Sequence, residues 1–199
     1  MKRAREVIDL ILKRFLIWRA QNLDTSTFIL LVAVVTGLIS GLVAVVLKNA
    51  AHAVRELVVA QRLSDIYQVG YFLFPLIGIS IVMVLRHNLK WRMKEGIPMA
   101  LGAIAKDGGI IPRSAMYTSF VGSAFTVGFG GSVGLEGPTV GTGAAIGSNL
   151  ARRLRLGFKQ RILLISCATA GALGSIFGTP IAALVFTLEV FSLDLTLGA

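Results

Sequence analysis

One carboxylate, Glu136, stands between helix-breaking residues within the apolar, glycine-rich stretch 130–141. A charged side chain at membrane depth costs about 2.5 to 3.5 kcal/mol, so an acid there is a candidate functional group. Pro138 favours the first turn of a helix, where its missing N–H costs nothing, and Gly134 and Gly137 let the backbone approach a ligand closely. A helix start presents unpaired N–H groups and the positive end of the helix dipole. The stretch therefore predicts an anion site made from backbone, with a carboxylate beside it.

Three segments of the chain resemble, in order, motifs of the CLC family of chloride channels and chloride/proton antiporters. Residues 95–98, Glu-Gly-Ile-Pro, are similar to its G-S-G-I-P element, and residues 134–138, Gly-Leu-Glu-Gly-Pro, are similar to its G-x-E-G-P signature. Residues 177–190 resemble the segment that carries its inner glutamate. The resemblance runs from about residue 28 to the end. It implies that Glu136 is a gate, which occupies the outer anion site and swings away to admit a halide.

The resemblance also implies two helix starts that direct backbone N–H groups toward the anion. The residues that would form them are Gly96, Ile97, Pro98, Gly134, Leu135 and Gly137. Where the family usually places a serine that hydrogen-bonds the central anion, this chain has Glu95. An ionised carboxylate there would repel an anion strongly at a low effective dielectric. Three alternatives stay open: Glu95 turns toward cytoplasmic water and Lys94, it is protonated, or the local alignment slips.

A second intramembrane acid, Glu189, is followed by Val190, where family antiporters often carry the acid that relays a proton. A hydrogen-bonded structural role for Glu189 is favoured, because a buried polar group needs a partner. Glu95 and Glu189 are the two candidates for a proton relay in this half. Because valine cannot bind a proton, channel-like anion movement is favoured over proton-coupled antiport, which remains the alternative.

The elements that would position these residues are membrane helices. Of the 199 residues, 55% are hydrophobic and only 15% are charged, and residues 28–47 carry no charge. About 20 apolar residues span a bilayer as a helix. The sequence predicts an all-α polytopic membrane protein whose short, tilted and broken helices form one half of a CLC-type inverted-repeat fold. Its second repeat is expected to be absent from this chain, so that the chain should not conduct alone.

The net charge of +10 is concentrated in three clusters of Lys and Arg, within residues 2–19, 86–94 and 152–161. Each cluster lies between apolar segments, as the positive-inside rule expects of cytoplasmic loops. No nucleic-acid motif occurs, so nucleic acid is not an expected partner. We expect a multi-pass protein of the bacterial inner membrane with a cytoplasmic N-terminus.

The chain divides into two expected parts: residues 1–22 form a basic amphipathic helix on the inner membrane surface, and residues 23–199 form the membrane domain. Two crossings are expected first, over residues 27 to about 53 and 69–85, with an external loop at 54–68. Shorter segments follow: helices at 97–105, 114–127 and 136–150, a loop at 106–113, and a short helical pair at 162–173 and 180–192 joined by 174–180.

Two alternatives to a chloride pathway stay open. The first is an integral-membrane enzyme with Glu136 as general base, which would need a second polar catalytic group at membrane depth, and none is found. The second is a transporter of another small anion. We therefore expect no catalytic residues, no metal and no cofactor. The expected partners are chloride or a similar small anion, the lipid bilayer and, in the full-length protein, a second copy as a homodimer.

Overall fold

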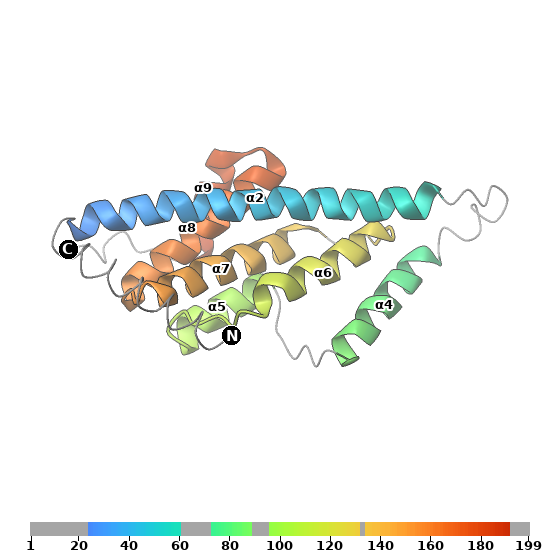
Figure 1. The fold of residues 1–199 in the computed structure, drawn as a ribbon, viewed down its shortest axis with the longest axis horizontal. Helices are drawn as coiled ribbons and strands as arrows, with labels where there is room; N and C mark the ends of the chain where they lie inside the picture. Colours follow the sequence, from blue (N-terminus) through green and yellow to red (C-terminus); the bar gives the residue numbers. More distant parts are fainter. Residues whose placement is uncertain (1–23, 61–72, 89–95, 132–133, 192–199) are drawn as a thin grey trace, which may run out of the picture.

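The longest element of the computed structural model is α2 (Thr25–Ala60), a helix that runs along one whole side of the molecule (Figure 1). The structure describes residues 24–60, 73–88, 96–131 and 134–191. Every regular element within these ranges is a helix. The others, in chain order, are α4 (Phe74–Asn88), α5 (Gly96–Lys106), α6 (Ala115–Gly128), α7 (Glu136–Arg153), α8 (Phe158–Phe177) and α9 (Pro180–Val190). The predicted all-α fold class is confirmed.

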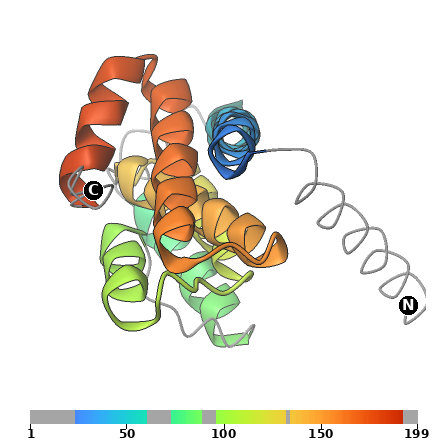
Figure 2. The ribbon, with the colours of Figure 1, turned by 90° about the vertical axis from the view of Figure 1, so that its left-hand side faces the viewer.

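Glycines bring α2, α7 and α8 into direct backbone contact. A Cβ on Gly171 of α8 would collide with the backbone of Gly37 on α2, and a Cβ on Gly147 of α7 would lie 2.5 Å from the carbonyl oxygen of Leu164 on α8. Helices that meet through small residues pack closely, which is how helices associate within a membrane. The three helices therefore form one tightly packed block, with α8 between α2 and α9 (Figure 2).

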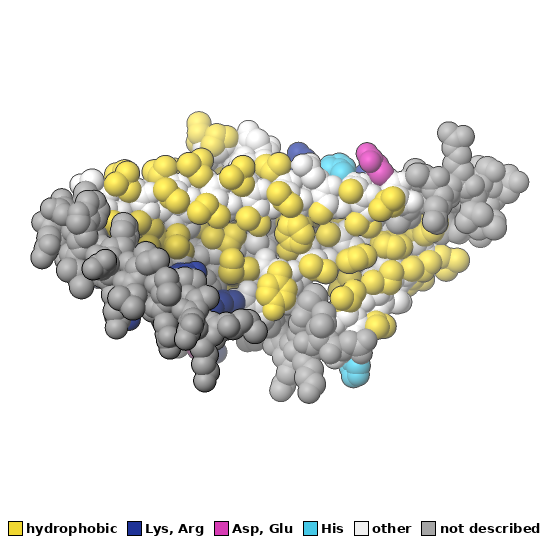
Figure 3. Space-filling view, viewed as in Figure 1, with side chains coloured by type: hydrophobic (Ala, Val, Ile, Leu, Met, Phe, Trp, Pro, Cys, Tyr) yellow, Lys and Arg dark blue, Asp and Glu magenta, His cyan; other side chains and the backbone are white. Residues whose placement is uncertain are grey.

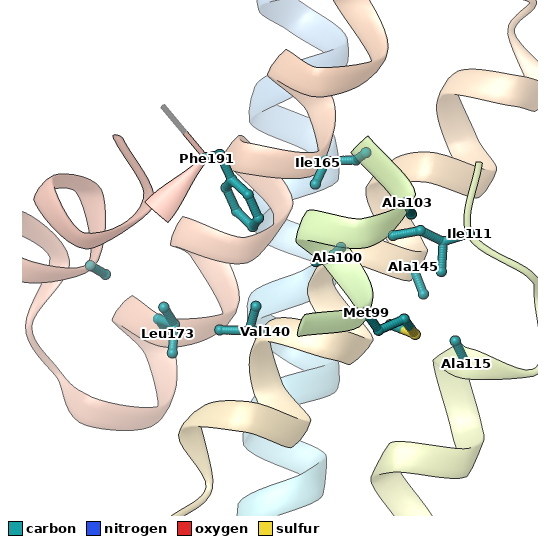
Figure 4. Packing of buried hydrophobic residues seen from close by; sticks show 12 residues of the cluster. Met99, Ala100, Ala103, Ile111, Ala115, Val140, Ala145, Ile165, Leu173 and Phe191 are labelled. Atoms are coloured by element: carbon teal, nitrogen blue, oxygen red, sulfur yellow. The ribbon is translucent and has the colours of Figure 1, made fainter. Parts of the chain in front are cut away.

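The short helix α5 is held against this block by a core of small side chains. Met99, Ala100 and Ala103 of α5 pack with Val140 of α7 and Ile165 of α8 (Figure 4). Alanines make up a large part of the cluster, so the helix axes approach closely. This core fixes the start of α5 beside the start of α7.

Within the described residues, two helices are long and apolar enough to cross a membrane, judged by length and composition: Thr25–Leu57 within α2, and α8. Apolar side chains are spread over the face of the molecule that Figure 3 shows. On α2, Leu30, Leu38 and Leu42 are each more than half exposed. A large exposed apolar surface is unfavourable in water and marks contact with lipid or protein. The predicted crossing near residues 27–53 therefore has the composition and surface of a membrane span.

The external loop predicted at 54–68 is wrong over residues 54–60, because α2 continues to Ala60. Residues 54–60 contain no glycine or proline, and the charged side chains of Arg55 and Glu56 are exposed on the helix surface. Charged residues do not end a helix when no breaking residue accompanies them. The rest of the expected loop, residues 61–68, lies outside the described residues. Residues 69–72 of the expected return crossing also lie outside them, and α4 is the helix described in its remaining part.

The predicted short helix at 162–173 is also wrong, since α8 has 20 residues and only Gly178 and Thr179 join it to α9. Gly174 lies inside α8 and allows close packing, because a Cβ there would be 3.4 Å from Pro180. The helix ends instead at Gly178, which adopts φ 68°, and Pro180 opens α9. A left-handed glycine followed by a proline is a common way to end one helix and begin another.

The remaining predicted boundaries agree with α5, α6, α7 and α9 to within a few residues. The amphipathic helix expected at 1–22 lies outside the described residues, so this division of the chain stays a prediction.

Candidate anion site

Helix α7 begins at Glu136, with Pro138 in its first turn as predicted. No side chain caps this helix start. The N–H of Thr139 donates to the carbonyl oxygen of Leu135 at 3.1 Å, at the beginning of the helical hydrogen-bond pattern. The N–H groups of Glu136 and Gly137 precede that bond, and such early N–H groups have no partner inside a helix. The start of α7 can therefore donate hydrogen bonds to an anion.

The Glu136 side chain is exposed in the described part of the chain. It lines a hollow of about 390 Å³ whose other walls come from the end of α8 and the beginning of α9. The lining residues are Glu136, Leu173, Phe177, Thr179, Ala182, Ala183 and Phe186. Because the hollow is open, the carboxyl group has room to move away from the start of α7.

The start of α5 lies directly against the start of α7. Gly96 has φ 70°, and a Cβ on it would lie 3.2 Å from both the Cα and the carbonyl oxygen of Gly137. A Cβ on Gly141 would lie 3.1 Å from the backbone nitrogen of Gly96. Both the left-handed conformation and the lack of space select glycine at residue 96. The structure thus brings together two helix starts that are forty residues apart in the sequence.

The predicted anion-binding residues occupy these two starts. Gly96, Ile97 and Pro98 form the first turn of α5, and Gly134 and Leu135 lead into α7. Glu95 lies outside the described residues, so its three alternatives stay open. The positive ends of two helix dipoles, each equivalent to roughly half an elementary charge, meet here and favour an anion.

Glu189 lies near the end of α9, three residues beyond Phe186 at the edge of the hollow, and is exposed. It comes nine positions after Pro180, a rise of about 14 Å along the helix. Val190 packs against the buried core that holds α5. The position that the motif resemblance assigns to a relay acid is therefore occupied by an apolar side chain, and the role of Glu189 stays a prediction.

Sequence reasoning missed the polar residues that fix the far end of α5. The N–H of Ile111 donates to Ser148 Oγ at 2.9 Å, and the Ser148 hydroxyl donates to the carbonyl oxygen of Gly109 at 2.6 Å. The Arg161 guanidinium donates to the carbonyl oxygen of Gly108 at 2.7 Å. These bonds tie the 107–114 loop to α7 and α8, so α5 is anchored at both ends.

Replacing Ser148 by alanine should lower the free energy of unfolding of the full-length protein by about 2 kcal/mol, because the buried Ile111 N–H and Gly109 carbonyl would lose their partner. Thermal unfolding in detergent measures the change. Ser166→Ala is the control, since the Ser166 hydroxyl bonds only the Ile162 carbonyl of its own helix. Equal melting temperatures for the two variants would show that the loop anchor contributes nothing.

The geometry agrees with a comparison against known protein families. The family model described as voltage gated chloride channel matches residues 80–199, which include both helix starts. The chain belongs to this family. The resemblance to the CLC family that the sequence motifs indicated is therefore confirmed.

Curated members of the voltage-gated chloride channel family resemble the chain over much of its length. An H(+)/Cl(−) exchange transporter ClcA from Salmonella arizonae is 28% identical over 94% of this chain and 41% of its own length. A ClcB-like chloride channel protein from Ralstonia nicotianae is 32% identical over 57% of this chain and 27% of its own. A chloride/fluoride channel protein from Pseudomonas syringae is 27% identical over 61% of this chain and 27% of its own.

The family relatives are integral membrane proteins of bacteria, and their names describe channels and exchangers. The chain spans less than half of the length of these curated relatives. No solved structure matches the chain significantly.

Proposed function

We propose that the full-length protein moves chloride or a similar small anion across the membrane, and that Glu136 gates this movement. The observation that supports the proposal most directly is the contact between Gly96 and Gly137, which brings the starts of α5 and α7 to one place. Backbone N–H groups and two dipole ends stabilise a negative charge there without a basic side chain. Glu136 stands at the same helix start, so its carboxylate competes with a soluble anion for these donors.

The substrate class follows from the relatives. One is named a chloride channel protein, another an H(+)/Cl(−) exchange transporter and a third a chloride/fluoride channel protein. Chloride is therefore the first anion to test, with fluoride and nitrate as competitors. An enzymatic role for Glu136 is disfavoured, because the other described residues that line its hollow include no acid and no base, and their one hydroxyl is that of Thr179.

We place the full-length protein in a bacterial inner membrane with its N-terminus in the cytoplasm, because the basic clusters lie on one side of the predicted crossings.

We further propose a homodimer. Ile181, Leu184 and Val185 of α9 are all more than half exposed and apolar, which leaves this helix free to pack against further protein.

The proposal is tested with the full-length protein in lipid vesicles loaded with chloride. We expect chloride efflux, recorded with a chloride electrode, when valinomycin allows potassium to leave with it. Vesicles without protein provide the background. Efflux that does not exceed the background would refute the proposed function, and preferential movement of fluoride or nitrate would change the assigned anion.

A chloride gradient is not expected to drive protons uphill, because Val190 cannot bind a proton and packs against apolar residues. The external pH is recorded while potassium and valinomycin clamp the membrane potential. Uphill proton movement would contradict the channel interpretation and establish an antiporter. The same pH recording on Glu95→Gln and on Glu189→Gln would then show which carboxylate carries the proton. Glu56→Gln, which changes an exposed acid on α2, is the control.

A further inference from the structure

A buried serine of α6, Ser119, lies beside the start of α5. Its Oγ is 3.3 Å from the point where a Cβ on Gly141 would lie, and the backbone nitrogen of Gly96 is 3.1 Å from the same point. The hydroxyl of one helix and the first amide of another thus both lie against Gly141 of α7. Glycine at residue 141 lets both groups come this close to the α7 backbone.

The Ser119 hydroxyl has no hydrogen-bond partner among the described residues, although the residue is only 2% exposed. Other buried serines in the same part of the chain do have partners. Ser123, one turn later on α6, donates to the Phe120 carbonyl at 3.0 Å, and Ser40 donates to the Ala168 carbonyl at 2.6 Å. Buried hydroxyls in native proteins are nearly always paired with protein, water or a bound ligand. Ser119 therefore needs a partner that the described protein atoms do not supply.

Three further buried hydroxyls on the same two helices also lack a partner within the described part of the chain. They belong to Thr118 on α6 and to Thr139 and Thr142 on α7. Thr139 and Thr142 lie on either side of Gly141 in the sequence. The unpaired polar atoms are concentrated around the α6–α7 contact near the start of α5, as expected where a polar ligand binds.

We propose that Ser119 donates a hydrogen bond to the anion bound at the start of α5 and thereby sets the affinity for it. The inference rests on the proposed function and adds a side-chain donor to a site otherwise made from backbone. A backbone N–H can only donate, and the positive end of the α5 dipole disfavours a cation, so the shared ligand has to be an acceptor. Glycine at residues 96 and 141 brings the α5 start, the Ser119 hydroxyl and the α7 backbone close together.

The test compares variants of the full-length protein in detergent, with chloride binding measured by calorimetry. Ser119→Ala should raise the Kd for chloride about tenfold or more, because a hydrogen bond to a charged group is lost. Ser119→Thr keeps the hydroxyl and should restore most of the affinity. Ser123→Ala is the matched control on the same helix: its hydroxyl already bonds Phe120, so the Kd should stay unchanged.

The pH dependence of chloride flux separates Ser119 from the gate. It should be the same in Ser119→Ala and in the unmodified protein, because Glu136 is untouched. A Kd for Ser119→Ala equal to that of the unmodified protein, at an equal melting temperature, would overturn the inference and leave the proposed function standing. If Ser119→Ala does not fold, Ser119→Cys replaces it, and an unchanged Kd there would count equally against the inference. Failure of the unmodified protein to bind or move any halide would refute both proposals.

Discussion

Glu136→Ala in the full-length protein is expected to raise halide occupancy of the site and to abolish most of the pH dependence of transport. In the proposed mechanism the carboxylate, fixed at the start of α7, competes with a halide for the N–H groups there. Alanine cannot compete and cannot take up a proton. Halide binding is measured by calorimetry, and chloride flux from vesicles is measured over a series of pH values.

Two variants provide the controls for this prediction. Glu136→Gln removes the charge but keeps the shape, so it should also remove the pH dependence while still hindering passage sterically. Glu56→Ala removes an exposed acid on α2, far along the chain from the site, and should change neither quantity. An unchanged flux and pH profile in Glu136→Ala would remove Glu136 from the mechanism.

Gly96→Ala should reduce chloride flux by more than tenfold. The residue has φ 70°, where a side chain costs about 1 to 2 kcal/mol, and its Cβ would press on the Gly137 backbone at 3.2 Å. Relief of that contact moves the starts of α5 and α7 apart, and a site that depends on both loses its geometry. Flux from vesicles and anion binding by calorimetry should fall together.

Gly102→Ala is the matched control for Gly96→Ala, because Gly102 lies on the same helix and a Cβ there meets no atom within 4 Å. This change should leave flux intact and stabilise α5 slightly, by about 0.5 to 1 kcal/mol, since alanine favours a helix more than glycine. Gly96→Ala with full flux and unchanged anion affinity would show that the α5–α7 contact does not form the site.

The sequence alone predicts those parts of the fold and site that depend on short stretches of chain. Glu136 and Pro138 identify the start of α7 because a proline in a first turn acts locally. The length of α8 was underestimated, because Gly174 looks like a helix breaker in the sequence but serves a packing contact with α9. A glycine has the same sequence signature in both roles, and only the neighbouring helix distinguishes them.

The contact between α5 and α7 depends on packing between distant segments, so no local pattern contains it. The motif resemblance marks Gly96 and Gly137 as parts of one site, but their backbone contact follows from the core that Met99 and Val140 help to form. Ser119 carries no sequence signal, because a serine within an apolar helix usually bonds its own backbone. Its unpaired hydroxyl becomes apparent only when burial and hydrogen bonds are known.

The direct backbone contacts of Gly171 with Gly37 and of Gly147 with Leu164 have a consequence for the speed of gating. Helices that touch through main-chain atoms have no flexible side chains between them, so a sliding or tilting motion would require many contacts to break at once. Such collective motions take microseconds to milliseconds, whereas an exposed side chain changes rotamer in picoseconds to nanoseconds. Glu136 is exposed beside an open hollow. For the gate that we propose, a single side-chain rotation of Glu136 on a nearly stationary frame is therefore the fastest movement that this part of the chain offers, and the waiting time between openings would be set by competition for the N–H groups.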